Sequence, residues 1–357
     1  MSIARAARDA GFEVLIATRV DKHKERIENE GFKLIQINLN RKSRNILKGI
    51  LSVLEIARIY HKEKPDVVHH VSVKPVLYGS LAAWITGIPA VVNAVAGLGS
   101  IFATPGKKAA ILRNFIIFSY RLAFSPKNTV GIFQNPEDLS LFVSAKILKK
   151  EQTFLIRGSG VNTTFFRYLP EPKGIPVLVL AARLIWDKGV GSFVEAARIL
   201  KNSGVVCRMA LAGRPDPGNP KSIPEETLRS WASEGIIEWW GYREDILEVF
   251  AQSNIVVLPT TYGEGVPRVL IEAASCGRPI VATDVPGCRE IVVNNKNGLL
   301  IPRDDPKALA DALRGLIGDP LLRSKMGISG REIAKAEFSE EIFVKDTMNV
   351  YKKMLKK

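Results

Sequence analysis

Cysteine is scarce in this 357-residue sequence, and its three copies, Cys207, Cys276 and Cys288, are scattered along the second half. Their spacing fits neither a disulfide framework nor a zinc site, so we expect a reducing compartment. Long apolar runs are missing too, because no stretch of about 18 uncharged apolar residues occurs, which argues against a membrane-spanning helix. The first residues carry no apolar core of the kind found in a secretory leader.

Cofactor and metal motifs are also missing. No G-x-G-x-x-G follows a predicted strand and no Walker loop is present, so neither a nicotinamide cofactor nor a P-loop is predicted. No Asp-x-Asp follows an apolar strand, and Asp304-Asp305 opens a helix as an N-cap would. We therefore expect no cofactor and no metal ion. His69 and His70 end a predicted strand, where they could either contact a ligand or serve the structure.

The charge is unevenly distributed. The formal net charge is +15, and residues 1–170 hold 25 Lys and Arg against 12 Asp and Glu. The remaining 187 residues hold 26 against 24. The basic first half is either a solvated face or a surface that attracts an anionic partner, lipid or nucleic acid. No nucleic-acid-binding module is recognisable, so we expect no nucleic acid as a partner.

Short apolar runs alternate with amphipathic helical patterns along the chain. This βαβα order is typical of parallel sheets covered by helices, and the length suits two such domains. A Pro- and Gly-rich segment at 169–176 predicts domains 1–170 and 171–357, with a cleft at the carboxyl ends of their strands. The last helix could pack back on the first domain. The predicted strands are 12–18, 32–37, 66–71, 89–94, 129–134, 153–157, 176–181, 206–212, 236–240, 254–259, 279–283 and 298–301. Helices are predicted between the strands of the first half, notably 43–63 and 74–87, and in the second half near 188–203, 243–252, 266–276, 305–317 and 338–355.

The chain opens on a helix, and its first predicted strand comes second. A doubly wound domain normally begins with a strand that lies centrally in the sheet. Without that strand, its neighbours would keep buried backbone groups unpaired. We therefore hypothesise that about one strand and one loop are missing upstream of Met1, through a fragment or a misassigned start.

Two glutamates, Glu264 and Glu272, dominate the most informative segment, residues 262–279. Glycines flank Glu264. Pro267 suits the first position of a helix, and a glycine and a proline further along would end that helix. One carboxylate is thus expected on a loop before a helix, and the other about two turns inside it. Backbone N–H groups and the positive end of the helix dipole lie between them. Such a site suits a phosphate flanked by two hydroxyl-bearing rings, as in a nucleotide-sugar.

A glycoside hydrolase is the alternative use of two carboxylates. Its pair stands roughly 5–9.5 Å apart. Eight helical steps would separate Glu264 and Glu272 by about 12 Å. Hydrogen bonding to hydroxyl groups is therefore the better interpretation.

A basic segment follows the first strand of the second half. Arg183 comes just after the strand, and Lys188 lies five residues on, where the next helix begins. This is the switch-point position of a doubly wound sheet. An arginine fork with a lysine charge could neutralise a diphosphate leaving group there. The alternative is an ordinary loop with surface cations. The presence of the segment with Glu264 and Glu272 argues against this alternative.

Residues 107–124 combine four cations and no acid with a rich apolar set. A core-facing helix explains Phe115, Phe118, Tyr120 and Phe124 but not the purely basic polar face. Helices that lie on anionic membranes have this composition. Both interpretations stay open.

These segments resemble the retaining glycosyltransferases of family 4 (glycosyl transferases group 1), over nearly the whole chain. The resemblance implies the α/β GT-B fold, with two Rossmann-like domains that face a cleft. In the second half it rests on 182–184, 187–189, 211–213, 241–246, the E-x7-E element within 259–272, and 277–283. The first half is similar to the bacterial capsule and exopolysaccharide branch at 69–75, 91–99 and 133–138.

The resemblance implies a role for each donor-site residue. Arg183 and Lys188 would hold the donor diphosphate, and Glu264 would bond sugar hydroxyls; these three form the expected catalytic set. Glu272 would bind the ribose hydroxyls, and Arg243 would lie beside the base. The full donor-binding set is Arg183, Lys188, Gly213, Arg243, Glu264, Gly265, Val266 and Glu272. On the acceptor side the expected residues are His70, Lys74 and Asn135.

The implied reaction is sugar transfer with retention, from a nucleotide-sugar, with UDP as the expected nucleotide. The acceptor would be a polyprenyl-diphosphate-linked sugar or a saccharide in bacterial surface polysaccharide biosynthesis. The enzyme would be cytoplasmic and peripherally associated with the inner face of the cytoplasmic membrane, on an anionic surface. Two alternatives stay open: a sugar-nucleotide epimerase or phosphorylase of the same fold, and a truncated, inactive nucleotide-sugar-binding protein.

Overall fold

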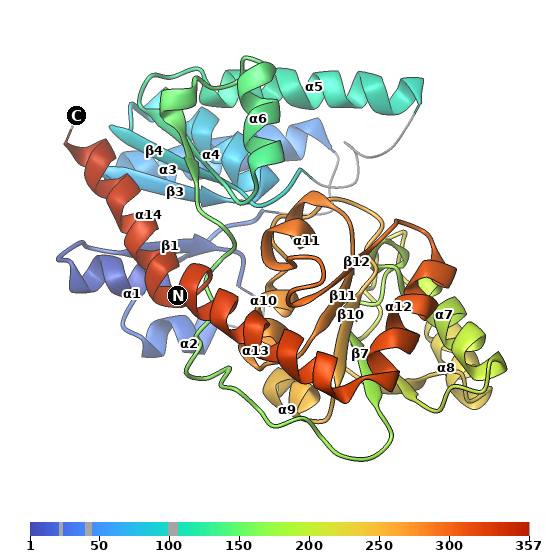
Figure 1. Cartoon of the computed structure of the whole chain (residues 1–357). Coiled ribbons are helices and arrows are strands. Elements are labelled where there is room, and N and C mark those ends of the chain that lie inside the picture. Colours follow the sequence, from blue (N-terminus) through green and yellow to red (C-terminus); the bar gives the residue numbers. More distant parts are fainter. Residues whose placement is uncertain (21–23, 40–44, 99–105, 357) are drawn as a thin grey trace. The chain divides into compact units, whose positions relative to one another are not determined.

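The computed structural model describes residues 1–20, 24–39, 45–98 and 106–356 (Figure 1). Contacts within the chain define two compact units. The first contains Met1–Ile156 and Glu341–Lys357, and the second contains Arg157–Glu340. All strand pairs in both units are parallel within the described residues, as the alternating pattern predicts.

The second unit is built on one six-stranded sheet with the order β12-β11-β10-β7-β8-β9. The strands are β7 (Val177–Ala181), β8 (Arg208–Ala212), β9 (Glu238–Gly241), β10 (Ile255–Leu258), β11 (Ile280–Thr283) and β12 (Gly298–Ile301). The chain runs outward from β7 in one direction and from β10 in the other. The loops after these two central strands therefore part at a topological switch point, where ligands bind in such sheets.

Side chains alternate along β7 and feed two separate cores. Val177 and Val179 join the cluster on one face, and Leu178 and Leu180 join the cluster on the other. The first face is covered by α9 (Ile246–Ala251), α10 (Arg268–Ser275), α11 (Pro286–Ile291) and much of α13 (Pro320–Glu337). The second is covered by α7 (Val190–Asn202), α8 (Glu225–Ser233) and α12 (Pro306–Gly318). Each fully buried aliphatic side chain contributes about 1.5–3 kcal/mol to folding.

The first unit holds two separate sheets. One pairs β1 (Leu15–Thr18) with β2 (Lys33–Gln36), and the other has the order β3-β4-β5-β6. The strands of the larger sheet are β3 (Val67–Val71), β4 (Ala90–Val95), β5 (Thr129–Phe133) and β6 (Thr153–Leu155). No backbone pairing joins β1 to β3 within the described residues. The expected extra strand upstream of Met1 stays a prediction.

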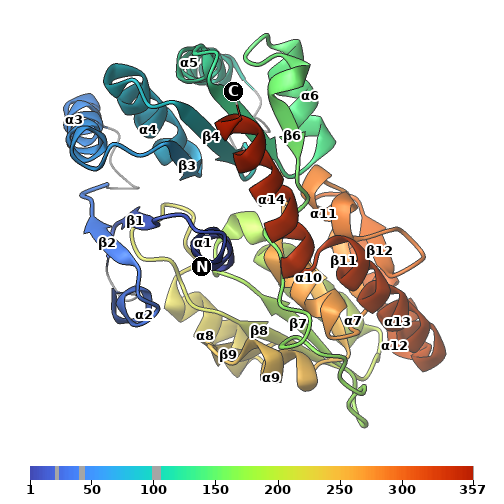
Figure 2. The same ribbon diagram turned by 90° about the vertical axis from the view of Figure 1, so that its left-hand side faces the viewer.

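Helices cover both faces of the larger sheet in the first unit. α1 (Ser2–Asp9) and α14 (Glu340–Leu355) share a core with strand residues such as Val92 and Val130. α4 (Val73–Thr86), α5 (Lys107–Phe124) and α6 (Pro136–Ser144) form another core with Phe133. α3 (Ile46–Glu63), α4 and α5 lie side by side (Figure 2). The short helix α2 (Lys24–Asn29) contacts β2.

In the second half of the chain the structure has three helices that the sequence-based assignment lacks, α8, α11 and α13. The longest of them, α13, begins at the proline of the Gly318-Asp319-Pro320 sequence, which normally ends a helix. Asp319 instead caps the new helix by accepting a bond from the amide of Leu322 at 2.8 Å. The helical pattern is also broken by two buried glycines, Gly327 and Gly330.

The division between the units also falls earlier than the Pro- and Gly-rich segment. Residues 157–169 belong to the second unit because Val161, Phe166 and Leu169 are buried in its core. The buried guanidinium of Arg278 donates to the carbonyls of Leu169 and Pro170, at 3.1 and 2.8 Å. Turn-rich composition therefore marks an irregular surface segment here and not the end of a compact unit.

Candidate functional site

The loops after β7 and β10 are held together by their backbones. Gly189 has a φ of 74°, and a Cβ at this position would lie 1.8 Å from the carbonyl oxygen of Pro259. The amide of Thr261 donates to the carbonyl of Asp187 at 3.0 Å. Only glycine combines this left-handed conformation with so close an approach. The contact places Lys188 directly beside the loop that carries Glu264.

Lys188 and Glu264 form a largely buried ion pair at this point. The Lys188 ammonium lies 2.6 and 2.5 Å from the two carboxylate oxygens of Glu264. The side chains are only 12% and 18% exposed. The hydroxyl of Thr260 lies 3.1 Å from the same carboxylate, and the ring of Tyr262 lies 5.9 Å from the ammonium. An ammonium suited to phosphate and a carboxylate suited to hydroxyl groups thus stand together at the switch point.

Tyr262 stays a hydrogen-bond donor in this setting. Burial raises the pKa of its phenol, and the nearby charge of Glu264 raises it further. The charge of Arg183 lowers the pKa and so acts in the opposite direction. Arg183 itself is 58% exposed and donates to Asp216 at 2.8 Å.

Glu272 lies closer to the start of its helix than the sequence suggests. α10 begins at Arg268 with Pro267 as its N-cap, so Glu272 is just over one turn inside and not two. The prediction was wrong because the loop before α10 continues past Val266, whose side chain is buried in the core. The Glu272 carboxylate accepts a bond from Arg268 Nε at 2.7 Å. Burial raises its pKa, and the Arg268 charge partly offsets this.

The loop that carries Glu264 rests on the first turn of α11. A Cβ on Gly287 would lie 1.8 Å from the carbonyl oxygen of Gly265 and 2.6 Å from that of Glu264. This close backbone packing fixes the height of residues 263–266 above the sheet. The position of the Glu264 carboxylate is therefore set by a glycine 23 residues later in the sequence.

Two further residues of the predicted donor site lie after neighbouring strands. Gly213 follows β8, and its amide donates to the carbonyl of Gly241 at 2.7 Å. Arg243 follows β9, the outermost strand on that side, and binds the carboxylate of Asp245 through two nitrogens at 2.7 and 2.6 Å. The structure thus brings Lys188 and Glu264 together but does not bring Arg243 into their contacts.

His70 of the acceptor-side set is part of a buried network in the first unit. Its Nδ1 lies 2.7 Å from Asn93 Oδ1, and its Nε2 lies 2.6 Å from the hydroxyl of Tyr60. Burial lowers the pKa of His70 to about 4, so the ring is neutral near pH 7. The amide oxygen of Asn93 needs a donor, which assigns the proton to Nδ1 and makes Nε2 the acceptor. Both ring nitrogens are therefore occupied by structural bonds.

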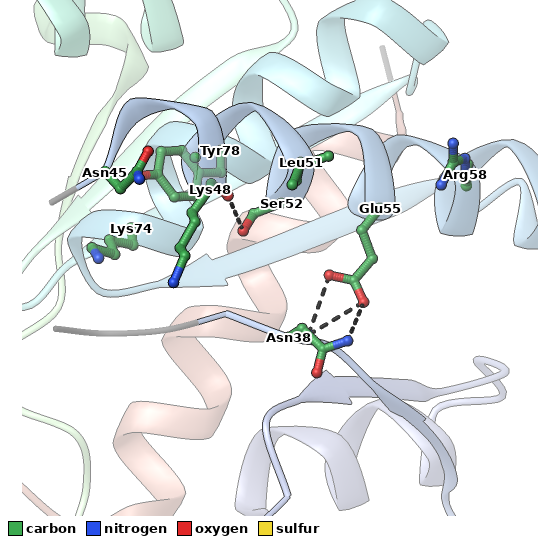
Figure 3. Close-up of a pocket in the computed structure, with 10 residues that line it drawn as sticks. Asn38, Asn45, Lys48, Leu51, Ser52, Glu55, Arg58, Lys74 and Tyr78 are labelled. Atoms are coloured by element: carbon green, nitrogen blue, oxygen red, sulfur yellow. Dashed lines mark hydrogen bonds between the residues drawn. The ribbon is translucent and has the colours of Figure 1, made fainter. Parts of the chain in front are cut away.

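Asn135 is likewise engaged within the fold. It is the N-cap of α6, where its Oδ1 accepts from the amide of Asp138 at 2.8 Å and its Nδ2 donates to the Asp138 carboxylate at 3.0 Å. Lys74 lies in the first turn of α4 and lines a cavity of the first unit (Figure 3). Contact of these residues with an acceptor stays a prediction.

Sequence reasoning missed Thr260, Tyr262 and Gly287. A signal for the first was available, because a polar Thr260-Thr261 pair directly follows an apolar strand at its carboxyl end. Gly287 gives no local signal, since its importance comes from a loop distant in sequence.

Among the described residues no group of three or more His, Cys, Asp or Glu side chains is placed to hold a metal ion. None of the described helices is both long and apolar enough to cross a membrane.

Two family models match this chain. The model for glycosyl transferases group 1 matches residues 175–319, and the model for glycosyl transferase 4-like proteins matches residues 1–135. The chain belongs to the glycosyltransferase family that these two models describe. It is therefore a sugar-transferring enzyme by family, as the motifs predict.

Curated relatives and solved structures agree with this membership. The chain is 29% identical to N,N'-diacetylbacillosaminyl-diphospho-undecaprenol alpha-1,3-N-acetylgalactosaminyltransferase of Campylobacter jejuni, covering 100% of this chain and 95% of the relative. It is 25% identical to the capsular polysaccharide glycosyltransferase CapM of Staphylococcus aureus, covering 87% and 83%. A glycosyltransferase structure from Rickettsia africae matches with a TM-score of 0.79 and 20% identity, covering 99% and 93%. Anabaena HepE in complex with UDP matches with a TM-score of 0.77 and 20% identity, covering 99% and 94%. The predicted GT-B fold is confirmed.

Replacing Gly287 with alanine tests the packing that positions Glu264. The added methyl would collide with the Gly265 carbonyl, so we expect the variant to lose about 1–3 kcal/mol of unfolding free energy, as overpacked sites do. Urea unfolding followed by circular dichroism measures this. Gly315→Ala is the matched control, because a Cβ there meets nothing within 4 Å, and it should be neutral or slightly stabilising. Equal stability of Gly287→Ala and the wild type would contradict the packing argument.

Proposed function

We propose that this glycosyltransferase moves a sugar, with retention, from a UDP-sugar to a polyprenyl-diphosphate-linked acceptor in bacterial surface polysaccharide biosynthesis. The observation that carries the proposal is the Lys188–Glu264 pair, held where the loops after β7 and β10 part. Two relatives are named for diphospho-undecaprenol-linked acceptors, from Campylobacter jejuni and Escherichia coli. HepE, a structural neighbour, is described in complex with UDP and with UDP-glucose.

The donor roles follow from the charges at the switch point. We assign the donor diphosphate to Arg183 and Lys188, because a guanidinium and an ammonium can neutralise the charge that develops on a leaving diphosphate. These cations would do the work of a divalent metal, so we propose that none is required. Glu264 would accept bonds from the transferred sugar, next to the amides of Gly265 and Val266. Glu272 would accept bonds from the ribose hydroxyls.

The first unit supplies a surface for peripheral contact with an anionic membrane. α5 buries Ala109, Tyr120, Ala123 and Phe124 in the core. Its opposite face exposes Ile111, Phe115, Phe118 and Leu122, which recur at the spacing of a single helical stripe. Phe115 and Phe118 are 64% and 63% exposed, and the helix carries no Asp or Glu. A basic helix with exposed aromatic residues suits the interface of an anionic bilayer.

The donor assignment predicts the affinity for UDP. Arg183→Ala combined with Lys188→Ala should weaken UDP binding at least about tenfold, because two charge-assisted contacts to the diphosphate are lost. Isothermal titration calorimetry without added divalent metal measures this. The matched control is Arg229→Ala combined with Lys307→Ala, which removes the same charges from exposed helix positions. UDP affinity that is unchanged in the Arg183/Lys188 variant would move the diphosphate elsewhere.

The role of Glu264 predicts a loss of turnover. Glu264→Gln keeps the side-chain shape but weakens an acceptor whose contact tightens in the transition state, so kcat should fall about 100-fold. The assay is UDP release from UDP-glucose, UDP-galactose and their N-acetyl forms, with a polyprenyl-diphosphate-linked sugar as acceptor. UDP affinity should be kept, and the surface variant Glu226→Gln should turn over normally. Near-normal turnover of Glu264→Gln would refute the role.

The exposed face of α5 predicts the binding of vesicles. Phe115→Ser combined with Phe118→Ser should lower the fraction of protein that sediments with phosphatidylglycerol vesicles several-fold, because the apolar anchors are lost. Phosphatidylcholine vesicles should bind the wild type weakly. Leu321→Ser is the control, because Leu321 is an exposed apolar residue of the second unit. If the double variant sediments like the wild type, α5 is not the contact.

A further inference from the structure

The first unit contains a cavity of about 430 Å³ between α3, α4 and Asn38, which lies just after β2 (Figure 3). This volume falls within the range of small-molecule sites. Its wall is set by close helix packing, because a Cβ on Gly49 of α3 would lie 3.1 Å from the hydroxyl of Tyr78 on α4. On the opposite side the Glu55 carboxylate accepts a bond from the amide of Asn38 at 3.2 Å. The cavity is therefore a built feature of the first unit.

The lining of this cavity is cationic and polar. Three cations, Lys48, Arg58 and Lys74, line it together with one acid, Glu55. Asn38, Asn45, Ser52 and Tyr78 add groups that can donate hydrogen bonds. Burial lowers the pKa of Lys74, so an anion bound beside it would favour its charged form. The excess of about two positive charges complements a group that carries about two negative charges, such as a diphosphate.

An apolar stripe lies along the rim of the cavity. Leu47, Ile50, Leu51 and Leu54 of α3 are 69%, 52%, 64% and 45% exposed. Their spacing of three and four residues puts them on one side of the helix, next to the side that carries Lys48 and Glu55. Leu51 belongs to both, because it also lines the cavity. Large exposed leucines in a row on one helix mark a surface that contacts an apolar partner.

We propose that this cavity binds the diphosphate of a prenyl-linked acceptor and that the prenyl chain leaves along the leucine stripe of α3. The proposal rests on the proposed function and names where its acceptor is held. A soluble anion would use the cations but would gain nothing from the leucines. A free isoprenoid would use the leucines but would bring no negative charge to the cations. An isoprenoid diphosphate joins the two chemistries in one molecule, and its charge matches the excess of about two positive charges in the lining.

Calorimetry with two probes tests both halves of the site. Farnesyl diphosphate should bind the wild-type chain at least about tenfold more tightly than inorganic pyrophosphate. Lys48→Ala combined with Lys74→Ala should weaken both probes at least about tenfold. Leu47→Ser combined with Leu51→Ser should weaken farnesyl diphosphate to the level of pyrophosphate and leave pyrophosphate unchanged. All four positions lie outside the buried core, and thermal unfolding verifies that each variant is folded.

Matched variants separate this site from general charge and from the α5 face. Lys62→Ala combined with Lys127→Ala removes two exposed lysines of the same unit and should keep both affinities. Phe115→Ser combined with Phe118→Ser should keep the affinity for farnesyl diphosphate. The proposal is overturned if the Lys48/Lys74 variant binds farnesyl diphosphate like the wild type. It is also overturned if the two probes bind the wild type equally, which would mean an adventitious anion only.

UDP binding in the same samples keeps the two proposals apart. All these variants should bind UDP like the wild type, because their residues lie in the first unit and the proposed donor site lies in the second. A wild type that binds farnesyl diphosphate but not UDP would defeat the donor assignment and leave the acceptor cavity standing. A wild type that binds UDP but not farnesyl diphosphate would do the reverse.

Discussion

The backbone contact between Gly189 and Pro259 is the constraint on which the rest of the proposed donor site depends. In a doubly wound sheet the loops after the two central strands diverge, and nothing in the topology alone fixes their separation. Here the absence of a Cβ on Gly189 lets the backbones of the two loops touch. The amide of Thr261 donates a hydrogen bond to the carbonyl of Asp187 beside this contact. Lys188 is thereby carried to Glu264 without a long or flexible connection. The geometry of the charged pair is a property of the backbone and costs no ordering of a loop when a ligand arrives.

The surroundings of the Lys188–Glu264 pair explain why a mostly buried charge pair is tolerated. Desolvation of an ammonium and a carboxylate is expensive, and an apolar pair would often be more stable. The Thr260 hydroxyl beside the carboxylate and the Tyr262 ring beside the ammonium offset part of this cost. The arrangement suits ligand binding more than it suits the stability of the fold. The ammonium and the carboxylate are already fixed in position and largely desolvated before a ligand binds. Polar groups fixed in advance stabilise developing charge more effectively than groups that must reorganise.

Much of the fold and part of the site could be read from the sequence. Every predicted strand range overlaps a strand of the structure, because buried parallel strands appear as short apolar runs between turn residues. The segments around Lys188 and Glu264 were recognisable because loops at strand ends carry unusual residue types. The role of Gly287 could not be recognised, since it depends on a carbonyl group that is distant in the sequence and that any side chain at this position would strike. The occupied nitrogens of His70 were equally hidden, because burial and partners from two other elements decide whether a histidine faces a ligand or the core.

The place of α14 has a consequence for how the protein is made. The chain leaves the first unit after Ile156, completes the second unit, and returns with the residues from Glu341 onward. Met348, Val350 and Tyr351 then pack against the strands of the first unit. During synthesis the part of this apolar face that α1 does not cover therefore stays exposed until residues 341–355 have left the ribosome. The second unit is contiguous and can fold as soon as it emerges, so the half that is translated first is the half that is finished last.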